Sequence, residues 1–170
     1  MRVFKDVFTG DEMFTDSHMP KLVDDVIYEV DAKRITVSNK VDDRLIGANP
    51  STEEGGDERT EDTTQTVIDL VHGSRLVQTY FDKKGFMVWL KDYVNRVKEH
   101  IAKSDPDRVG EFQKKVQAYM SQVIKDFKEY EFFLGENMHV DGCVALMRYR
   151  PDDVTPYFVF LKDGLKEEKY

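Results

Sequence analysis

The sequence predicts an α+β protein with a β-rich body, a projecting antiparallel pair of helices and a flexible acidic loop. Three observations indicate this fold class. Apolar and polar residues alternate with period two in the first and last thirds of the chain, as they do in strands. Between residues 83 and 128 the apolar spacing becomes helical. A stretch rich in acidic and turn-forming residues follows the first strands.

Residues 1–37 are expected to form short strands. Val26, Tyr28, Val30 and Ala32 lie at alternate positions, and the residues between them are mostly more polar. This period places one set of side chains on the core face and the other on the solvent face. These strands are too few to close a hydrophobic core alone, so we expect residues 1–170 to form a single domain.

A mobile acidic loop is predicted from about residue 38 to about residue 65. The segment Asn49–Glu58 combines turn-forming residues with carboxylates, and the segment Thr60–Thr64 continues that composition. A loop of this length within a compact domain is usually functional or disordered. Strand signals resume in the segments Val67–Val71 and Leu76–Phe81, and His72–Ser74 is expected to form the turn between them.

Two helices are predicted in the hairpin region, about residues 83–128. Each carries one apolar stripe at helical spacing. The stripes are formed by Phe86, Leu90, Tyr93, Val94, Val97 and Ile101, and by Val109, Phe112, Val116, Met120, Val123 and Phe127. Asp105 is a suitable N-cap for the second helix, with Pro106 at its first position. The short connection makes the two helices antiparallel.

The last third of the chain is expected to return to strands. Residues 143–149 alternate between more and less apolar side chains, and Cys143 is expected to pack there as a small apolar group. The run Tyr157–Leu161 is continuously apolar, which is typical of a strand buried on both faces.

Composition excludes several classes of function. The net charge of −8 disfavours binding to nucleic acid, which depends on neutralising phosphates. No run approaches the roughly 20 apolar residues that span a bilayer, so no membrane partner is expected. The charged segment Met1–Asp6 lacks the apolar core of a secretory signal, and Cys143 is the only cysteine. We therefore expect a cytoplasmic protein.

No catalytic constellation is visible in the sequence. The four histidines, at positions 18, 72, 100 and 139, are scattered without metal-ligand spacing. There is neither a glycine-rich phosphate loop nor a nucleophile elbow. We therefore expect a protein that is not an enzyme and that requires no cofactor.

Charge is distributed unevenly along the chain. Residues 83–128 contain eleven basic and six acidic side chains, a net charge of +5, which leaves −13 for the rest. Such asymmetry influences the choice of partners more than it shapes the fold. The two interpretations are a surface for an acidic partner and a set of lysines that only solvate the outer helix faces.

Three segments carry a resemblance to a known family. They are Ile46–Glu53, Phe132–Met138 and Thr155–Phe158, the last running into Lys162–Leu165. Further matches occur at Phe4–Asp6, Asp11–Asp16, Tyr80–Lys84, Pro106–Val109 and Phe127–Lys128. The matches run in the same order from end to end, and by them the chain resembles the translationally controlled tumour protein family. The resemblance implies a tent-like β-rich body, similar to that of a zinc-containing class of small-GTPase accessory proteins. Zinc does not carry over, because that class uses cysteine pairs.

The resemblance also implies calcium binding. Carboxylate and carbonyl oxygens are the ligands that calcium prefers, although no EF-hand spacing is present. We take Asp42, Asp43 and Asn49 as the candidate ligands of a weak site. Further loop acids are Glu53, Glu54, Asp57 and Glu58. Ordering such a loop costs about 1–2 kcal/mol per residue, so the alternative is an acidic loop that only maintains solubility.

The partners that the resemblance implies are macromolecules. Tubulin, in microtubules, is expected on the basic helices, and the candidate residues are Lys91, Arg96, Lys98, Lys103, Lys114 and Lys115. A Ras-like small GTPase is expected at Asp11 and Glu12, where an acid can compete with phosphate or perturb a bound magnesium ion. The alternative at this position is an acid that caps a nearby backbone amide.

Two functional hypotheses therefore stay open. The first is a calcium-binding, microtubule-associated interaction protein linked to cell growth and survival, with apoptosis regulators among its implied partners. The second is a regulator of a small or translational GTPase, including a translation elongation factor, that accelerates or blocks nucleotide release.

Overall fold

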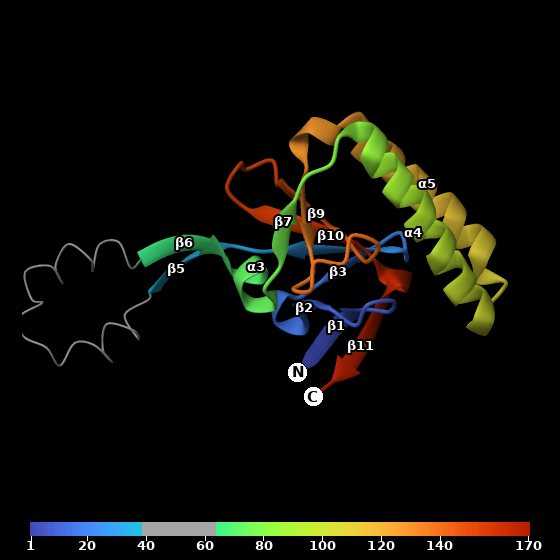
Figure 1. Ribbon diagram of the computed structural model, residues 1–170, viewed down its shortest axis with the longest axis horizontal. Coiled ribbons are helices and arrows are strands. Elements are labelled where there is room, and N and C mark those ends of the chain that lie inside the picture. Colours follow the sequence, from blue (N-terminus) through green and yellow to red (C-terminus); the bar gives the residue numbers. More distant parts are fainter. Residues whose placement is uncertain (39–63) are drawn as a thin grey trace, which may run out of the picture.

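Antiparallel sheets make up the body of the molecule in the computed structural model, which describes residues 1–38 and 64–170 (Figure 1). The six-stranded sheet is the largest, because the most apolar strands of the sequence meet in it. Its strands in spatial order are β3 (Lys21–Val23), β4 (Ile27–Asp31), β10 (Pro156–Leu161), β9 (Ala145–Tyr149), β8 (Glu131–Leu134) and β7 (Val77–Thr79).

Strand β10 lies near the centre of this sheet. It pairs with β4 on one side, where Phe158 lies opposite Val30, and with β9 on the other, where Phe158 lies opposite Met147. Phe158 and Val159 are both fully buried although they point to opposite faces. The prediction that this apolar run forms a strand buried on both faces is confirmed.

A three-stranded sheet brings the two ends of the chain together. Its order is β11 (Leu165–Lys169), β1 (Arg2–Asp6) and β2 (Glu12–Thr15). Arg2 pairs with Lys169, and the Met1 amino group donates a hydrogen bond to the Tyr170 carbonyl at 3.1 Å. The termini therefore lie side by side (Figure 1). The short 3₁₀ helix η1 (Asp16–His18) follows β2.

The β5 (Arg34–Ser38) and β6 (Thr64–Ile68) strands form a separate two-stranded ribbon. It extends from the body on the side opposite the long helices (Figure 1). Ser38 pairs with Thr64, so the predicted loop of about 38–65 was one residue too long at its start and two at its end. The rest of that predicted loop, residues 39–63, lies outside the described residues.

A short helix occupies the position where a turn was predicted. Helix α3 (Asp69–Ser74) follows β6 directly and ends at Arg75, whose φ of 56° places it in the left-handed region. Leu70 is fully buried on the inner side of this helix. The prediction of a strand through Val71 was wrong beyond Ile68, because a single buried residue per turn fits a helix as well as a strand over so short a run.

Helices α4 (Lys83–Ser104) and α5 (Arg108–Lys125) form the predicted antiparallel hairpin along one side of the sheets (Figure 1). The Asp82 side chain caps α4 by accepting a hydrogen bond from the Gly85 amide at 2.7 Å. The second cap was predicted wrongly. Asp105 ends α4, residues 105–107 form a turn, and α5 begins at Arg108 without a side-chain cap. The turn provides the bend that reverses the chain. The 3₁₀ helix η3 (Phe127–Glu129) then leads into β8.

The inner face of the hairpin shares the hydrophobic core of the sheets. Its buried residues are Phe86, Trp89, Tyr93, Val97, Ile101, Phe112, Val116, Met120 and Val123. The Trp89 indole donates a hydrogen bond to the Gly142 carbonyl at 3.0 Å. The predicted α+β class with a two-helix hairpin is confirmed. Among the described residues, no helix is long and apolar enough to cross a membrane.

A buried carboxylate fixes the hairpin to the body. Asp6, at the end of β1, is 2 % exposed and accepts hydrogen bonds from the Thr9 hydroxyl at 2.8 Å and the Cys143 amide at 3.0 Å. The Tyr93 hydroxyl of α4 donates to the same carboxylate at 3.1 Å. Because a buried polar group is costly unless it is satisfied, these donors hold three separate segments in one arrangement. The 3₁₀ helix η4 (Lys162–Gly164) contributes the Gly164 carbonyl beside the same hydroxyl.

Candidate functional site

The outer face of the α4–α5 hairpin carries several lysines without salt-bridge partners among the described residues. Its lysines face outward because the apolar stripe of each helix is used against the sheets, which leaves polar positions on the solvent side. Lys91, Lys103 and Lys114 are exposed, and Lys98 is half-buried. None of these four lysines has a salt-bridge partner among residues 1–38 and 64–170.

Two of the predicted basic residues are used within the protein. The Arg96 guanidinium lies 3.1 Å from the Asp92 carboxylate, donates to the Asp141 carbonyl and stacks over the Phe8 ring. Lys115 forms an ion pair with Glu111 at 2.6 Å, and this hydrogen bond raises the pKa of Lys115. Within the predicted set of six, Arg96 and Lys115 therefore have salt-bridge partners inside the protein, whereas the other four lysines have none among the described residues.

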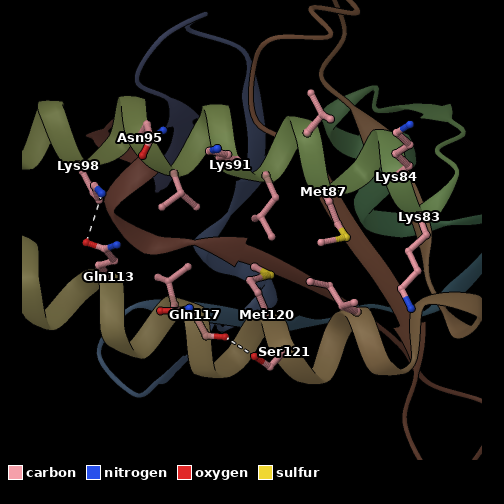
Figure 2. A pocket seen from close by; sticks show the side chains of 15 residues that line it. Lys83, Lys84, Met87, Lys91, Asn95, Lys98, Gln113, Gln117, Met120 and Ser121 are labelled. Atoms are coloured by element: carbon pink, nitrogen blue, oxygen red, sulfur yellow. Dashed lines mark hydrogen bonds between the residues drawn. The ribbon is translucent and has the colours of Figure 1, made fainter.

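A groove between the two helices collects lysines that the charge pattern alone did not single out. Figure 2 shows Lys83, Lys84, Lys91 and Lys98 following α4 along one side of this groove, which has a volume of about 880 Å³. Lys83 and Lys84 were counted in the basic segment but not predicted as binding residues. The seven-residue spacing of Lys84, Lys91 and Lys98 could have identified Lys84, because positions seven apart share one helix face, whereas no such spacing singles out Lys83.

Asp11 and Glu12 lie beside a smaller polar hollow. Glu12 is the first residue of β2 and its side chain is exposed, whereas Asp11 is 6 % exposed. The hollow measures about 430 Å³, and its charged lining residues also include Lys5, Arg75 and Glu136. Both signs of charge therefore meet around Glu12.

Contacts from a distant loop hold Asp11 in place. The Asn137 amide donates to an Asp11 carboxylate oxygen at 2.5 Å. Gly135 packs directly against Asp11, since a Cβ at position 135 would lie 2.5 Å from the Asp11 Cβ. Asp11 is thus a structural support for Glu12, and Glu12 is the member of the predicted pair that solvent and partners can reach. The backbone amide of Phe8 is capped by Asp6 rather than by Asp11, although the 3.4 Å contact is long.

The described residues contain no cluster of three or more histidine, cysteine or carboxylate side chains that could hold a metal ion. The predicted calcium ligands Asp42, Asp43 and Asn49 lie outside the described residues. Cys143 is buried, and this burial raises the pKa of its thiol, so the reactive thiolate is disfavoured. The prediction that Cys143 packs in the interior is confirmed.

The fold and these surfaces define a class: an α+β protein with a β-rich body whose helical hairpin presents an open basic face. Comparisons with known proteins agree with this fold class. The sequence model of the translationally controlled tumour protein family matches residues 1–166. The homologue from Schistosoma japonicum is 58 % identical over 170 residues and covers 100 % of both chains. The Schistosoma mansoni homologue is 48 % identical over 165 residues and covers 97 % of this chain and 99 % of its own.

Solved structures lead to the same family. The translationally controlled tumor-associated protein of Schizosaccharomyces pombe superposes with a TM-score of 0.84 at 43 % identity, with 100 % of both chains covered. The protein from Caenorhabditis elegans gives a TM-score of 0.72 at 30 % identity and covers 100 % of this chain and 99 % of its own. The chain belongs to the translationally controlled tumour protein family, as its motifs predicted.

Proposed function

We propose that this chain is a non-enzymatic interaction protein that binds acidic macromolecular surfaces on its helical hairpin, with tubulin in microtubules as the first candidate partner. The observation that carries the proposal is the row of lysines along α4 that have no salt-bridge partner in the described part of the chain. Unpaired lysines keep their full charge for a partner, and an acidic partner surface complements them.

Co-pelleting with microtubules tests this proposal. Lys91→Glu should reduce the bound fraction several-fold, because it reverses a charge in the middle of the row. Lys33→Glu is the matched control, since Lys33 is an exposed lysine between β4 and β5 and does not line the groove. Binding of the unmodified protein should fall as salt rises from about 0.05 M to about 0.5 M, because exposed charges are screened. Binding that ignores both salt and Lys91→Glu would contradict the proposal.

Calcium binding and a link to cell growth and survival belong to the same proposal. They follow from family resemblance and from the acidic composition around Asp42, Asp43 and Asn49. Calorimetry with calcium should give a weak binding heat that disappears in Asp42→Asn combined with Asp43→Asn. The absence of any heat at millimolar calcium would remove this part and leave the hairpin proposal intact.

A second candidate function is regulation of a small GTPase, and the geometry of Glu12 favours it. Glu12 is an exposed carboxylate at the start of a strand. The buried Asp11 before it is held by a hydrogen bond from Asn137 and by close packing of Gly135. A carboxylate held this way can contact a lysine or magnesium site without first being ordered. Release of labelled nucleotide from a Ras-like GTPase should change with this protein and lose that change in Glu12→Gln. Glu99→Gln, on the exposed side of α4, is the control.

A further inference from the structure

The groove between α4 and α5 is long and open. Residues from Lys83 to Lys98 line it along α4, and residues from Gln113 to Ile124 line it along α5 (Figure 2). Sixteen helical positions at a rise of 1.5 Å per residue correspond to a length of about 24 Å. This length matches a segment of secondary structure better than a compact small molecule.

Apolar side chains form the floor of the groove. Met87 and Val88 are 48 % and 66 % exposed, although the hairpin has already buried one apolar stripe per helix against the sheets. Leu90, Val94 and Ile124 are half-buried in the same groove. Exposed apolar surface gathered between polar margins is typical of a binding groove. A ligand that covered this floor would complete the burial of side chains that the hairpin leaves partly in water.

Positive charge forms the margin of the groove. Lys83, Lys84, Lys91 and Lys98 line it, whereas no acidic side chain of the described residues does. No carboxylate within the described ranges, 1–38 and 64–170, forms a salt bridge with any of these four lysines. Three of the four are spaced by seven residues, so they recur on one face of α4 every two turns. An occupant with acids at the same spacing would meet every one of those three.

We propose that this groove binds an acidic amphipathic α-helix of about 16 residues, laid along α4 and α5 as a third helix. The proposal rests on the proposed function, because it names the form of acidic partner that the same face accepts. The apolar seam of the partner would pack on Met87, Leu90 and Val94. Glutamates or aspartates beside the seam would pair with Lys84, Lys91 and Lys98, as charges beside the seam do in coiled coils.

One end of the groove is bridged by a hydrogen bond between the two helices. The Lys98 ammonium donates to the Gln113 side-chain oxygen across the two helices at 3.3 Å (Figure 2). At the opposite end, Lys83 and Lys84 lie at the first turn of α4 with no such bridge. The partner helix therefore extends past the Lys83 end and stops near Lys98, or displaces a single weak hydrogen bond to continue.

A second copy of this chain is the less suitable occupant. Its own hairpin segment carries a net charge of +5, so placing two of these faces together would bring lysine rows against each other. An extended acidic strand without a seam would neutralise the lysines and leave the floor exposed. Of these three occupants, only an amphipathic acidic helix both covers the apolar floor and pairs with the lysines of the margin.

Two synthetic peptides of about 16 residues test the proposal, because that length fills the groove. The seam peptide has leucines at heptad core positions and glutamates beside them. The scrambled peptide has the same composition with the leucines spread around the helix. Fluorescence anisotropy should show at least about tenfold tighter binding of the seam peptide, a difference of about 1.4 kcal/mol. Its circular dichroism should gain helical signal on binding.

Variants separate the floor from the margin. Met87→Gln should weaken the seam peptide several-fold, because it places a polar side chain on the floor of the groove. Met19→Gln is the matched control, since Met19 is 84 % exposed on the body and lies outside the groove. Lys91→Glu should weaken the seam peptide, whereas Lys33→Glu should not.

The outcomes distinguish this inference from the function it rests on. Equal binding of the two peptides, or no effect of Met87→Gln on the seam peptide, would overturn the helix groove and leave the electrostatic surface standing. Tight seam-peptide binding that Met87→Gln and Lys91→Glu both weaken would support the groove, even if microtubules failed to pellet the protein. That combination would remove tubulin as the partner and keep the acidic helix.

Discussion

The hydroxyl of Tyr93 is one of the groups that attach the hairpin to the body. It lies 3.1 Å from the Asp6 carboxylate and 3.4 Å from the Gly164 carbonyl, in a site with no exposure. Burial raises the pKa of Tyr93 well above its ordinary value, so the hydroxyl stays protonated and able to donate. The Tyr93 ring also stacks on Trp89 at a centroid separation of 5.1 Å.

Tyr93→Phe should lower the free energy of unfolding by about 1–3 kcal/mol, because it leaves one buried carboxylate oxygen short of a donor. Urea denaturation followed by circular dichroism measures this loss. Tyr80→Phe is the control, since Tyr80 is 82 % exposed and its hydroxyl remains in water. Equal stability of the two variants would show that the Asp6 carboxylate recruits another donor.

Glu168 on β11 should titrate far below an ordinary glutamate. Hydrogen bonds from Lys5 and from the Tyr170 hydroxyl, both at 2.7 Å, lower the pKa of Glu168 from 4.5 to about 2. A lowered pKa in the folded state stabilises the protein above the unfolded value, and this contribution is lost as pH falls from about 4.5 toward about 2. A carboxyl titration by NMR should therefore give a midpoint near 2.

Lys5→Met should move that midpoint upward, because the largest cause of the shift is the hydrogen bond from Lys5. Lys33→Met should leave it in place. If the Glu168 titration midpoint stayed near 2 in Lys5→Met, the hydrogen bonds from Tyr170 and Lys166 would be the cause of the lowered pKa.

Which charged side chains are free to bind a partner can be predicted only partly from the sequence. The pairing of Lys115 with Glu111 and of Arg96 with Asp92 follows from four-residue spacing on a helix, which the charge count overlooked. The burial of Asp11 was not predictable in the same way. It depends on Asn137, more than a hundred residues away in the chain.

Among the elements, α5 is anchored to the body at its first residue. Arg108, the first residue of α5, donates to both oxygens of Asp163 at 2.9 and 3.0 Å and to Asp25 at 2.8 Å. These carboxylates raise the pKa of Arg108 further, with the Asp163 hydrogen bond as the largest cause. The same guanidinium therefore joins α5, the turn before β4 and η4.

Arg108→Gln should lower the free energy of unfolding by about 1–2 kcal/mol, because it removes a bidentate charge-assisted contact that is partly screened by solvent. Arg75→Gln removes an exposed pair with Glu136 and should cost less than about 1 kcal/mol. Thermal unfolding of both variants makes the comparison. If both variants lost the same amount of stability, the partly buried contacts of Arg108 would contribute no more than an exposed ion pair.

Periodicity predicted the long elements and failed at the short ones. Helices α4 and α5 were foreseen because each repeats its apolar stripe over four or more turns. The start of α5 was placed two residues early, at Pro106 instead of Arg108. Asp105 has the side chain of a good N-cap, but in the structure it is the C-cap of α4. The six residues of α3 hold too few turns for a period to show.

For the whole molecule, the described hairpin and sheets share one hydrophobic core. Trp89, the only tryptophan, lies on α4, and its indole donates a hydrogen bond to the Gly142 carbonyl. Its fluorescence therefore reports the hairpin, whereas far-ultraviolet circular dichroism reports all elements. We expect the two urea transitions to coincide, as they do for a cooperative unit. An earlier tryptophan transition would make the hairpin a separate folding unit.

The overall distribution of charge could be predicted from sequence, but the groove could not. Counting residues 83–128 is enough to find a basic segment of +5. The groove depends on which apolar residues of the helices the body leaves uncovered. Exposed Met87 and buried Val116, for example, both line it. That selection depends on the packing of the two helices against the sheets.

The meeting of the two chain ends has a consequence for the topology of the backbone. Met1 and Tyr170 exchange hydrogen bonds at the edge of the pairing between β1 and β11. A short peptide linker joining them would make a ring without straining either strand. Such a cyclic protein would have fewer accessible conformations when unfolded and should resist heat and exopeptidases better than the linear chain.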